Sequence, residues 1–165
     1  MTKHRLTPLL ISLSGLALAT APAQAKEIAY DTTFCFAGTQ NVLMATKELT
    51  VFAIDLRGIV RTNTGDKSFD NDTGHCVGVN RISEKHVEAR GYCKIQSVNG
   101  DTYVGEYSAS GPPGSGGTWT VFHGTGKWSG IKGGGPYRPI TQGRPIAPGT
   151  FQNCNSNAGK YTLPD

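Results

Sequence analysis

Short stretches in which apolar and polar residues alternate recur along the chain, and each ends near Gly, Asn, Asp or Pro. This two-residue period is typical of half-buried β-strands, whereas no long helical period is found. We predict strands near residues 27–36, 47–61, 76–82, 86–95, 102–109, 118–123, 126–132 and 159–163. The Gly- and Pro-rich segment 133–148 is predicted to run as an irregular strap over one end. Short strands at this spacing indicate a sandwich or a barrel.

The segment 76–95 predicts a β-hairpin, because two strand-like runs flank a short polar stretch. A two-residue turn at Glu84 and Lys85 brings three cross-strand pairs into one register, namely Cys76 with Cys93, Arg81 with Glu88 and Val77 with Tyr92. The same register sets Gly78 opposite Gly91. The gap between these glycines suits a curved barrel wall, a closely approaching neighbour or a ligand.

The first 25 residues lack the strand pattern and have the three parts of a secretory signal. These parts are a basic start with Lys3, His4 and Arg5, an apolar stretch from Leu9 to Ala19, and an A-x-A cleavage site at 23–25. A membrane span needs about 20 apolar residues, and polar residues interrupt this shorter run. We therefore predict a cleaved signal peptide over residues 1–25, a single domain over residues 26–165 without a membrane span, and a periplasmic or secreted location.

The charge of the chain argues against a nucleic-acid partner. Cleavage of the signal removes Lys3 and Arg5 and lowers the formal net charge from +4 to +2. The remaining basic residues are scattered along the chain, whereas a nucleic-acid-binding domain gathers them on one face. The pattern specifies no oligomeric state.

Four cysteines remain after cleavage, and an even number in an exported chain predicts disulfides. The hairpin register pairs Cys76 with Cys93, which leaves Cys35 to pair with Cys154. The second bond would join the first and last strands, as a closed barrel requires. Zinc is not expected, because the chain has no C-x-x-C motif and no His at ligand spacing.

The segment from Gly124 to Gly135, GTGKWSGIKGGG, resembles the G-T-G-K-[FW]-x-G-x-x-G stretch of the allene oxide cyclase and dirigent-type barrels. It is also similar to that of a group of small exported bacterial proteins that share this barrel. His123 stands where the dirigent-type stretch has a further Gly, and the catalytic residues of neither enzyme family can be matched position by position. The resemblance implies an all-β fold, a single antiparallel barrel of six to eight strands with a mainly apolar interior, here stabilised by disulfides. It implies no activity.

An apolar barrel interior is a site for a small apolar or aromatic ligand. Its predicted lining comprises Tyr103 and the alternating residues Trp119, Val121 and His123. Glu106 and His123 are also candidates for proton transfer, because a carboxyl group that points into an apolar barrel has a raised pKa. A solvated Glu106 and a hydrogen-bonded structural His123 are the simpler interpretations.

No cofactor or metal is expected from the motifs. Lys127 lies in a glycine-rich stretch, but Trp128 stands where a phosphate loop has Ser or Thr, and no helical pattern follows. The acidic turn Asp66–Asp72 could hold calcium weakly. It departs from the EF-hand pattern, and an ordinary solvated loop is the simpler interpretation.

Three functions fit these predictions. The first is a binding protein whose barrel accepts a small apolar or aromatic molecule, and the second is an isomerase or cyclase in which Glu106 or His123 assists proton transfer. The third is a protein–protein module, such as an inhibitor or an envelope component, that uses the strap 133–148. A large cavity without an inward titratable group favours the first function, an inward Glu or His favours the second, and a packed interior favours the third.

Overall fold

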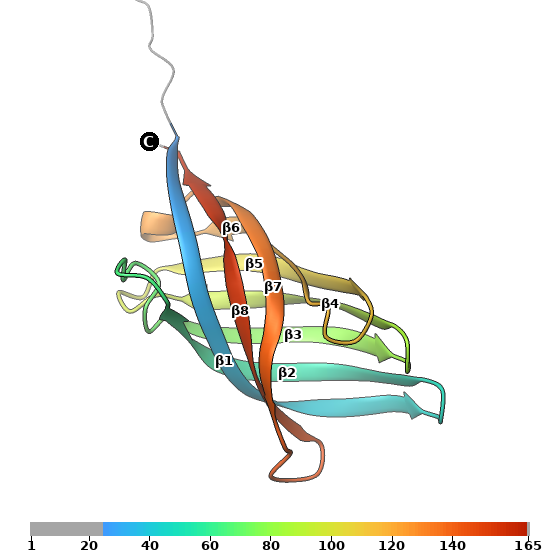
Figure 1. Ribbon diagram of the computed structural model, residues 1–165. Helices are drawn as coiled ribbons and strands as arrows, with labels where there is room; N and C mark the ends of the chain where they lie inside the picture. The colour runs from blue at the N-terminus through green and yellow to red at the C-terminus, as the bar shows by residue number, and fades with distance from the viewer. Residues whose placement is uncertain (1–24, 165) are drawn as a thin grey trace, which may run out of the picture.

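The alternating pattern forms a closed barrel of eight antiparallel strands in the computed structural model, which describes residues 25–164 (Figure 1). The strands follow one another around the barrel in chain order: β1 (Lys26–Ala45), β2 (Thr50–Thr62), β3 (Thr73–Ile82), β4 (Val87–Gln96), β5 (Thr102–Gly111), β6 (Gly117–Gly124), β7 (Lys132–Gly143) and β8 (Thr150–Leu163). β8 pairs with β1 and closes the barrel. The predicted fold class is confirmed, while residues 1–24 of the predicted signal peptide lie outside the described residues.

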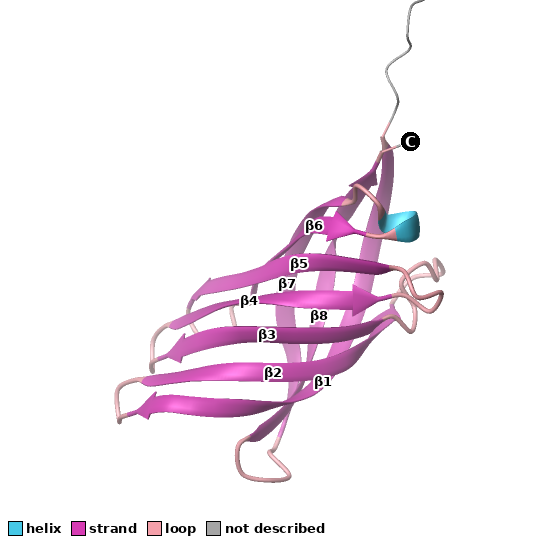
Figure 2. Ribbon diagram, turned by 180° about the vertical axis from the view of Figure 1, so that it is seen from behind, coloured by secondary structure: helices cyan, strands magenta, loops and turns pink. Residues whose placement is uncertain are grey.

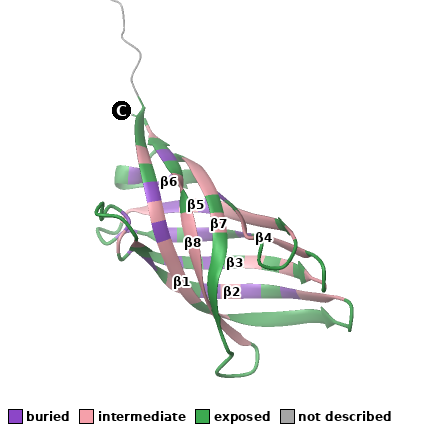
Figure 3. Cartoon of the chain, in the orientation of Figure 1, coloured by how far each residue is buried: buried purple, intermediate pink, exposed green. Residues whose placement is uncertain are grey.

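One face of each strand points into the barrel. In β2, the residues Phe52, Ile54, Leu56 and Val60 are buried, and the residues between them are half-buried or exposed. Buried positions therefore form separate bands along the strands in Figure 3. Burying such a side chain contributes about 1.5–3 kcal/mol, and a slip of one residue would turn all of them toward solvent.

The predicted hairpin is confirmed in its register and its turn. The pairs between β3 and β4 are Cys76 with Cys93, Val77 with Tyr92, Gly78 with Gly91 and Arg81 with Glu88. Ser83 N donates to His86 O at 2.8 Å across the two-residue turn.

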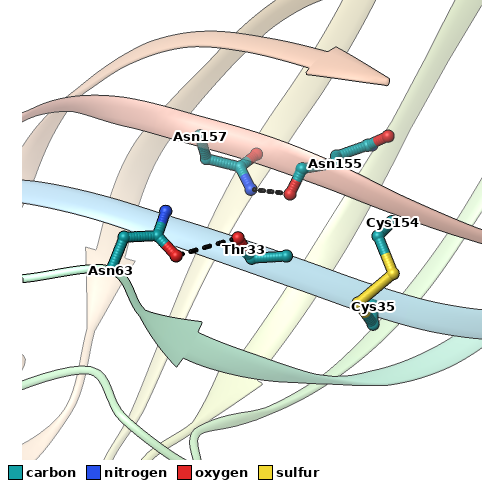
Figure 4. Close-up of a disulfide and its surroundings, with 6 residues drawn as sticks. All are labelled: Thr33, Cys35, Asn63, Cys154, Asn155 and Asn157. Atoms are coloured by element: carbon teal, nitrogen blue, oxygen red, sulfur yellow. Dashed lines mark hydrogen bonds between the residues drawn. A yellow bond between two sulfur atoms is a disulfide. The ribbon is translucent and has the colours of Figure 1, made fainter. Parts of the chain in front are cut away.

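Both predicted disulfides are present. Cys76–Cys93 is buried in the barrel wall, on the inward face of β3 and β4. Cys35–Cys154 joins β1 to β8 at the outer face (Figure 4), because the neighbours Phe34 and Phe36 take the inward positions.

The second half of the chain departs from the predicted elements. Residues 126–132, predicted as a strand, contain the short 3-10 helix η1 (Gly126–Trp128). Residues 132–143 form β7 instead of a strap, and β8 begins at Thr150 rather than near residue 159. β7 has few β-branched side chains, but its backbone pairs with β6 on one side and β8 on the other. β7 is therefore a strand because both neighbouring strands pair with its backbone, although its own sequence is not typical of a strand.

The two ends of the barrel are built differently (Figure 2). At one end, Phe69 stacks on Trp128 of η1 with ring centroids 5.2 Å apart, and Ile131 is fully buried. The other end carries the connections from β1 to β2, β3 to β4, β5 to β6 and β7 to β8. In the part of the chain that the structure describes, no helix is long and apolar enough to cross a membrane.

Candidate ligand cavity

The barrel contains a cavity of about 410 Å³. Its floor is aromatic and consists of Tyr30, Phe69, Tyr103, Trp119 and Tyr161. From this floor the cavity extends to the opposite end of the barrel, where the exposed residues Pro112 and Pro113 of the β5–β6 connection line its mouth. A concave, largely apolar site of this size is typical of small-molecule binding.

The floor is held by aromatic contacts and one buried hydrogen bond. Tyr30 stacks on Tyr161 with ring centroids 4.3 Å apart, and Phe69 meets Tyr161 edge to face. Trp119 donates its indole N–H to the Tyr161 hydroxyl at 2.9 Å. Packed aromatic rings have few alternative rotamers, so the floor is a preformed surface.

A buried carboxyl group lies behind this floor. Asp72 is 1% exposed, and its Oδ2 accepts hydrogen bonds from Ser97 Oγ at 3.2 Å and from the Tyr103 hydroxyl at 3.4 Å. Ser97 Oγ accepts the indole N–H of Trp128 at 2.8 Å. Burial raises the pKa of Asp72 to about 6, against the opposing effects of the Ser97 hydrogen bond and the charge of Lys127. Asp72 is not among the described residues that line the cavity, and its network joins three connections at the closed end.

Amide side chains line one wall of the cavity. Asn153, Asn155 and Asn157 occupy alternate inward positions of β8. Asn157 Nδ2 donates to the backbone oxygen of Asn155 at 3.2 Å (Figure 4). Asn153 Oδ1 and, on β3, Asn80 Oδ1 are buried without a hydrogen-bond partner in the described part of the chain. Buried amides are normally hydrogen-bonded, so these two oxygens are exceptions in the wall of the barrel.

Tyr107 fills the gap between the paired glycines of the hairpin. Its hydroxyl lies over Gly78 and Gly91, and a Cβ at either position would collide with it. Of the three interpretations of this gap, the closely approaching neighbour is therefore the one observed. The Tyr107 hydroxyl is itself buried and has no hydrogen-bond partner among residues 25–164.

The wall of the cavity carries no charge. Among the described residues that line it there is no Asp, Glu, Lys, Arg or His. Burial raises the pKa of Tyr30 and Tyr137 to about 12 and also raises that of Tyr107. These phenols are therefore neutral near pH 7, and the cavity offers apolar contacts and uncharged hydrogen-bonding groups.

The predicted site residues divide into inward and outward groups. Tyr103 and Trp119 line the cavity, and Val121 is buried in the interior although it is not part of the described lining. A β-bulge at Phe122 shifts the register between β5 and β6, so that His123 is exposed. The expected alternation of Trp119, Val121 and His123 onto one face thus fails at its last member.

Glu106 also points away from the cavity. Its Oε1 lies 2.8 Å from Nε of Arg90 on the outer face of the barrel. The pair is solvated, and such surface ion pairs contribute little stability. Glu106 is therefore a solvated surface residue in this structure.

The sequence interpretation missed the asparagines and Tyr107. The spacing of Asn153, Asn155 and Asn157 at every second residue is visible in the sequence. Polar residues at this spacing ordinarily occupy the solvent face of a strand, so the pattern alone gave no signal of an inward row.

The carboxylates of the acidic turn engage different partners. Asp66 Oδ1 accepts from the backbone and hydroxyl of Ser68, and Asp70 Oδ1 lies 2.9 Å from Arg61 Nε. Asp72 belongs to the buried network behind the cavity floor. Within the described residues, no three Asp, Glu, His or Cys side chains are grouped as metal ligands require.

No family model and no curated protein matches the sequence. In structure the chain is similar to the pterocarpan synthase dirigent protein, with a TM-score of 0.53 and 13% identity over 89% of this chain and 100% of that chain. The resemblance to allene oxide cyclases and to exported bacterial proteins stays a prediction. What the likeness shows is the fold, and this chain has a dirigent-like β-barrel.

Proposed function

We propose that this chain is an exported binding protein whose barrel takes up a small uncharged molecule with an apolar or aromatic body. The observation that carries the proposal is the cavity of about 410 Å³ with its aromatic floor and uncharged wall. Transfer of apolar surface from water into such a site is favourable by about 25 cal/mol per Å². A charged ligand would lose its hydration there without meeting a counter-charge. The predicted signal peptide and the two disulfides support export.

The other two functions have less support. A Glu or His pointing into the cavity would support the isomerase or cyclase, but Glu106 and His123 lie on the outer face. Asp72 is buried behind Tyr103 and is not in the described lining. The protein–protein module relied on a strap at 133–148, and most of that segment is β7 of the barrel wall.

Native mass spectrometry of the protein purified gently from its own host tests the binding function. We expect a population whose mass exceeds that of the mature chain by that of one small organic molecule. An entirely ligand-free mass, obtained without denaturants or organic solvent, would contradict the proposal.

A pair of variants locates the bound molecule. Ala109 lines the cavity, whereas the next residue, Ser110, is exposed. Ala109→Phe should remove the retained mass because the new ring occupies cavity volume, and Ser110→Phe should keep it. Equal retention in both variants would mean that the molecule binds outside the barrel.

A further inference from the structure

The two most exposed large apolar side chains of the described residues lie at the mouth end of the barrel. Ile146, in the β7–β8 connection, is 86% exposed, and Leu43, just before the β1–β2 connection, is 84% exposed. Val42 and Met44, the neighbours of Leu43, are exposed as well. Apolar side chains gathered in water at one place on a protein mark a site of interaction.

The end of β1 shows why these side chains are not used in the barrel wall. β8 pairs with β1 only as far as Thr39, so residues 40–45 pair with β2 alone and extend beyond the point where the barrel closes. A register shift between Val42 and Met44 leaves Leu43 as a bulge, and the usual alternation of inward and outward residues is lost there. Three consecutive apolar side chains therefore face water.

The other connections at this end complete an apolar rim around the mouth of the cavity (Figure 2). Pro112 and Pro113 of the β5–β6 connection line the mouth, and the β7–β8 connection reads RPIAPG. Of the four connections, 83–86 alone is polar throughout. We call these connections, with the adjoining residues 42–45, the mouth rim. In the described connections at the opposite end, Val98 is the single exposed large apolar residue.

The charges of the two ends also differ. The mouth rim has a formal charge of +1, because it contains Lys47, Lys85 and Arg144 against Glu48 and Glu84. The connections at the opposite end have a formal charge of −2, because they contain Asp66, Asp70, Asp72 and Asp101 against Lys67 and Lys127. An anionic surface therefore attracts the mouth rim and repels the other end, which orients the barrel.

We propose that the mouth rim docks on an anionic lipid surface, with Leu43 and Ile146 inserted among the lipids and the cavity open toward the bilayer. Apolar side chains that enter the interface of a bilayer leave water, while basic residues beside them meet the headgroups. Leu43 and Ile146 lie on separate hairpins. A fluid lipid layer accepts separate tips, whereas a protein interface needs a closely packed, complementary surface.

The orientation has a consequence for the proposed function. A molecule with an apolar body partitions into a bilayer, and a cavity that opens onto the bilayer exchanges such a molecule with it without passing it through water. This consequence rests on the proposed function, while the docking of the mouth rim does not.

Co-sedimentation of the mature, disulfide-bonded protein with vesicles of equimolar phosphatidylcholine and phosphatidylglycerol tests the docking. We expect the protein to bind these vesicles more strongly than vesicles of phosphatidylcholine alone, and added salt should reduce the difference. Leu43→Ser and Ile146→Ser should each lower the partition coefficient about tenfold, because each removes an apolar side chain that the lipids bury.

Val98→Ser is the matched control, because Val98 is 78% exposed at the opposite end. All three substitutions replace a highly exposed apolar residue with serine, so they should leave the fold equally intact. Val98→Ser should bind vesicles as the unmodified protein does. An equal loss of binding in all three variants would mean that Leu43 and Ile146 do not direct the docking, and the inference would be overturned.

Two further outcomes would also overturn the inference. One is that the unmodified protein binds neither kind of vesicle. The other is a concentration-dependent dimer, seen by sedimentation velocity without lipid, that Leu43→Ser abolishes while vesicle binding is absent, because the mouth rim would then bind a second copy of the chain. A small molecule retained in native mass spectrometry without vesicle binding leaves the proposed function standing, whereas vesicle binding by a ligand-free protein contradicts the proposed function alone.

Discussion

The hydroxyl of Tyr107 lies over Gly78, in the space where any other residue at position 78 would place its Cβ. Gly91, the cross-strand partner of Gly78, leaves the adjoining space to the same ring. The glycine pair thus makes room for a tyrosine that reaches across β4 from β5. Gly78 on β3 and Tyr107 on β5 therefore pack as one unit, because the glycine leaves the space that the tyrosine hydroxyl occupies.

The first prediction concerns this unit. Gly78→Ala should lower the free energy of unfolding by about 1–3 kcal/mol, as overpacking of a filled site does. Tyr107→Phe in the same chain should recover part of the loss, because it removes the nearest obstructing atom while the backbone oxygen of Arg90 still lies close. Urea unfolding of the four proteins of the double-mutant cycle measures the coupling.

The control is Gly65→Ala, since Gly65 has no neighbouring atom within 4 Å of its Cβ position. Simple additivity of the Gly78 and Tyr107 substitutions would show that the two residues do not interact.

The second prediction is a pH dependence that originates at Asp72. Its folded-state pKa of about 6 lies above the ordinary value of 3.8. Stability from the protonated carboxyl is therefore fully present below about pH 4 and is lost as the pH rises through 6. One pKa unit corresponds to about 1.4 kcal/mol, so the loss is about 3 kcal/mol.

Asp72→Asn isolates this effect from the titration of other groups. The variant should match the unmodified protein near pH 4 and exceed its free energy of unfolding at pH 8, when both are measured by urea denaturation. Glu84→Gln, at an exposed turn position, is the matched control for removing a negative charge. If the free energies of unfolding of Asp72→Asn and the unmodified protein differed by the same amount at pH 4 and pH 8, the buried carboxylate would not explain the pH dependence.

The third prediction concerns the order in which the disulfides are reduced. Cys76 and Cys93 are 2% and 7% exposed, whereas Cys35 and Cys154 are half-buried at the outer face. Thiol–disulfide exchange needs access to sulfur, so a mild thiol reductant should open Cys35–Cys154 first in the native protein. Alkylation followed by peptide mass mapping identifies the free thiols.

The bond Cys35–Cys154 joins two residues that are 119 positions apart in the chain. The chain-entropy model gives about 5 kcal/mol for a loop of this size, so the partly reduced protein should unfold at markedly lower urea concentration. When the protein is reduced in denaturant, Cys35–Cys154 should no longer open before Cys76–Cys93. Initial labelling of Cys76 and Cys93 in the native protein would oppose the prediction.

The fourth prediction concerns the cavity floor. Tyr161→Phe leaves the indole N–H of Trp119 buried without its acceptor, which should lower the free energy of unfolding by about 1–3 kcal/mol. Tyr92→Phe is the control, because Tyr92 is 48% exposed on the outer face. Equal unfolding midpoints for the two variants would mean that the buried hydrogen bond is replaceable.

The sequence alone predicted the first half of the barrel well, except that β1 continues to Ala45, nine residues beyond the predicted end at residue 36. In β2, β4 and β5, mostly apolar residues point inward and mostly polar residues point outward, because one face packs in the interior and the other meets solvent. The hairpin register followed from local cross-strand pairs, and it decided the disulfide Cys76–Cys93. With four cysteines, the pairing of Cys35 with Cys154 followed in turn.

Tertiary structure alone decided the remaining features. β7 is a strand because strands on both sides bind its backbone, which no property of its own residues reveals. The bulge at Phe122 arises from pairing with β5, and it turns His123 outward. The asparagines of β8 point inward because closure with β1 sets which face of β8 is enclosed. Alternation defines the two faces of a strand, but only long-range pairing determines which face lines the cavity.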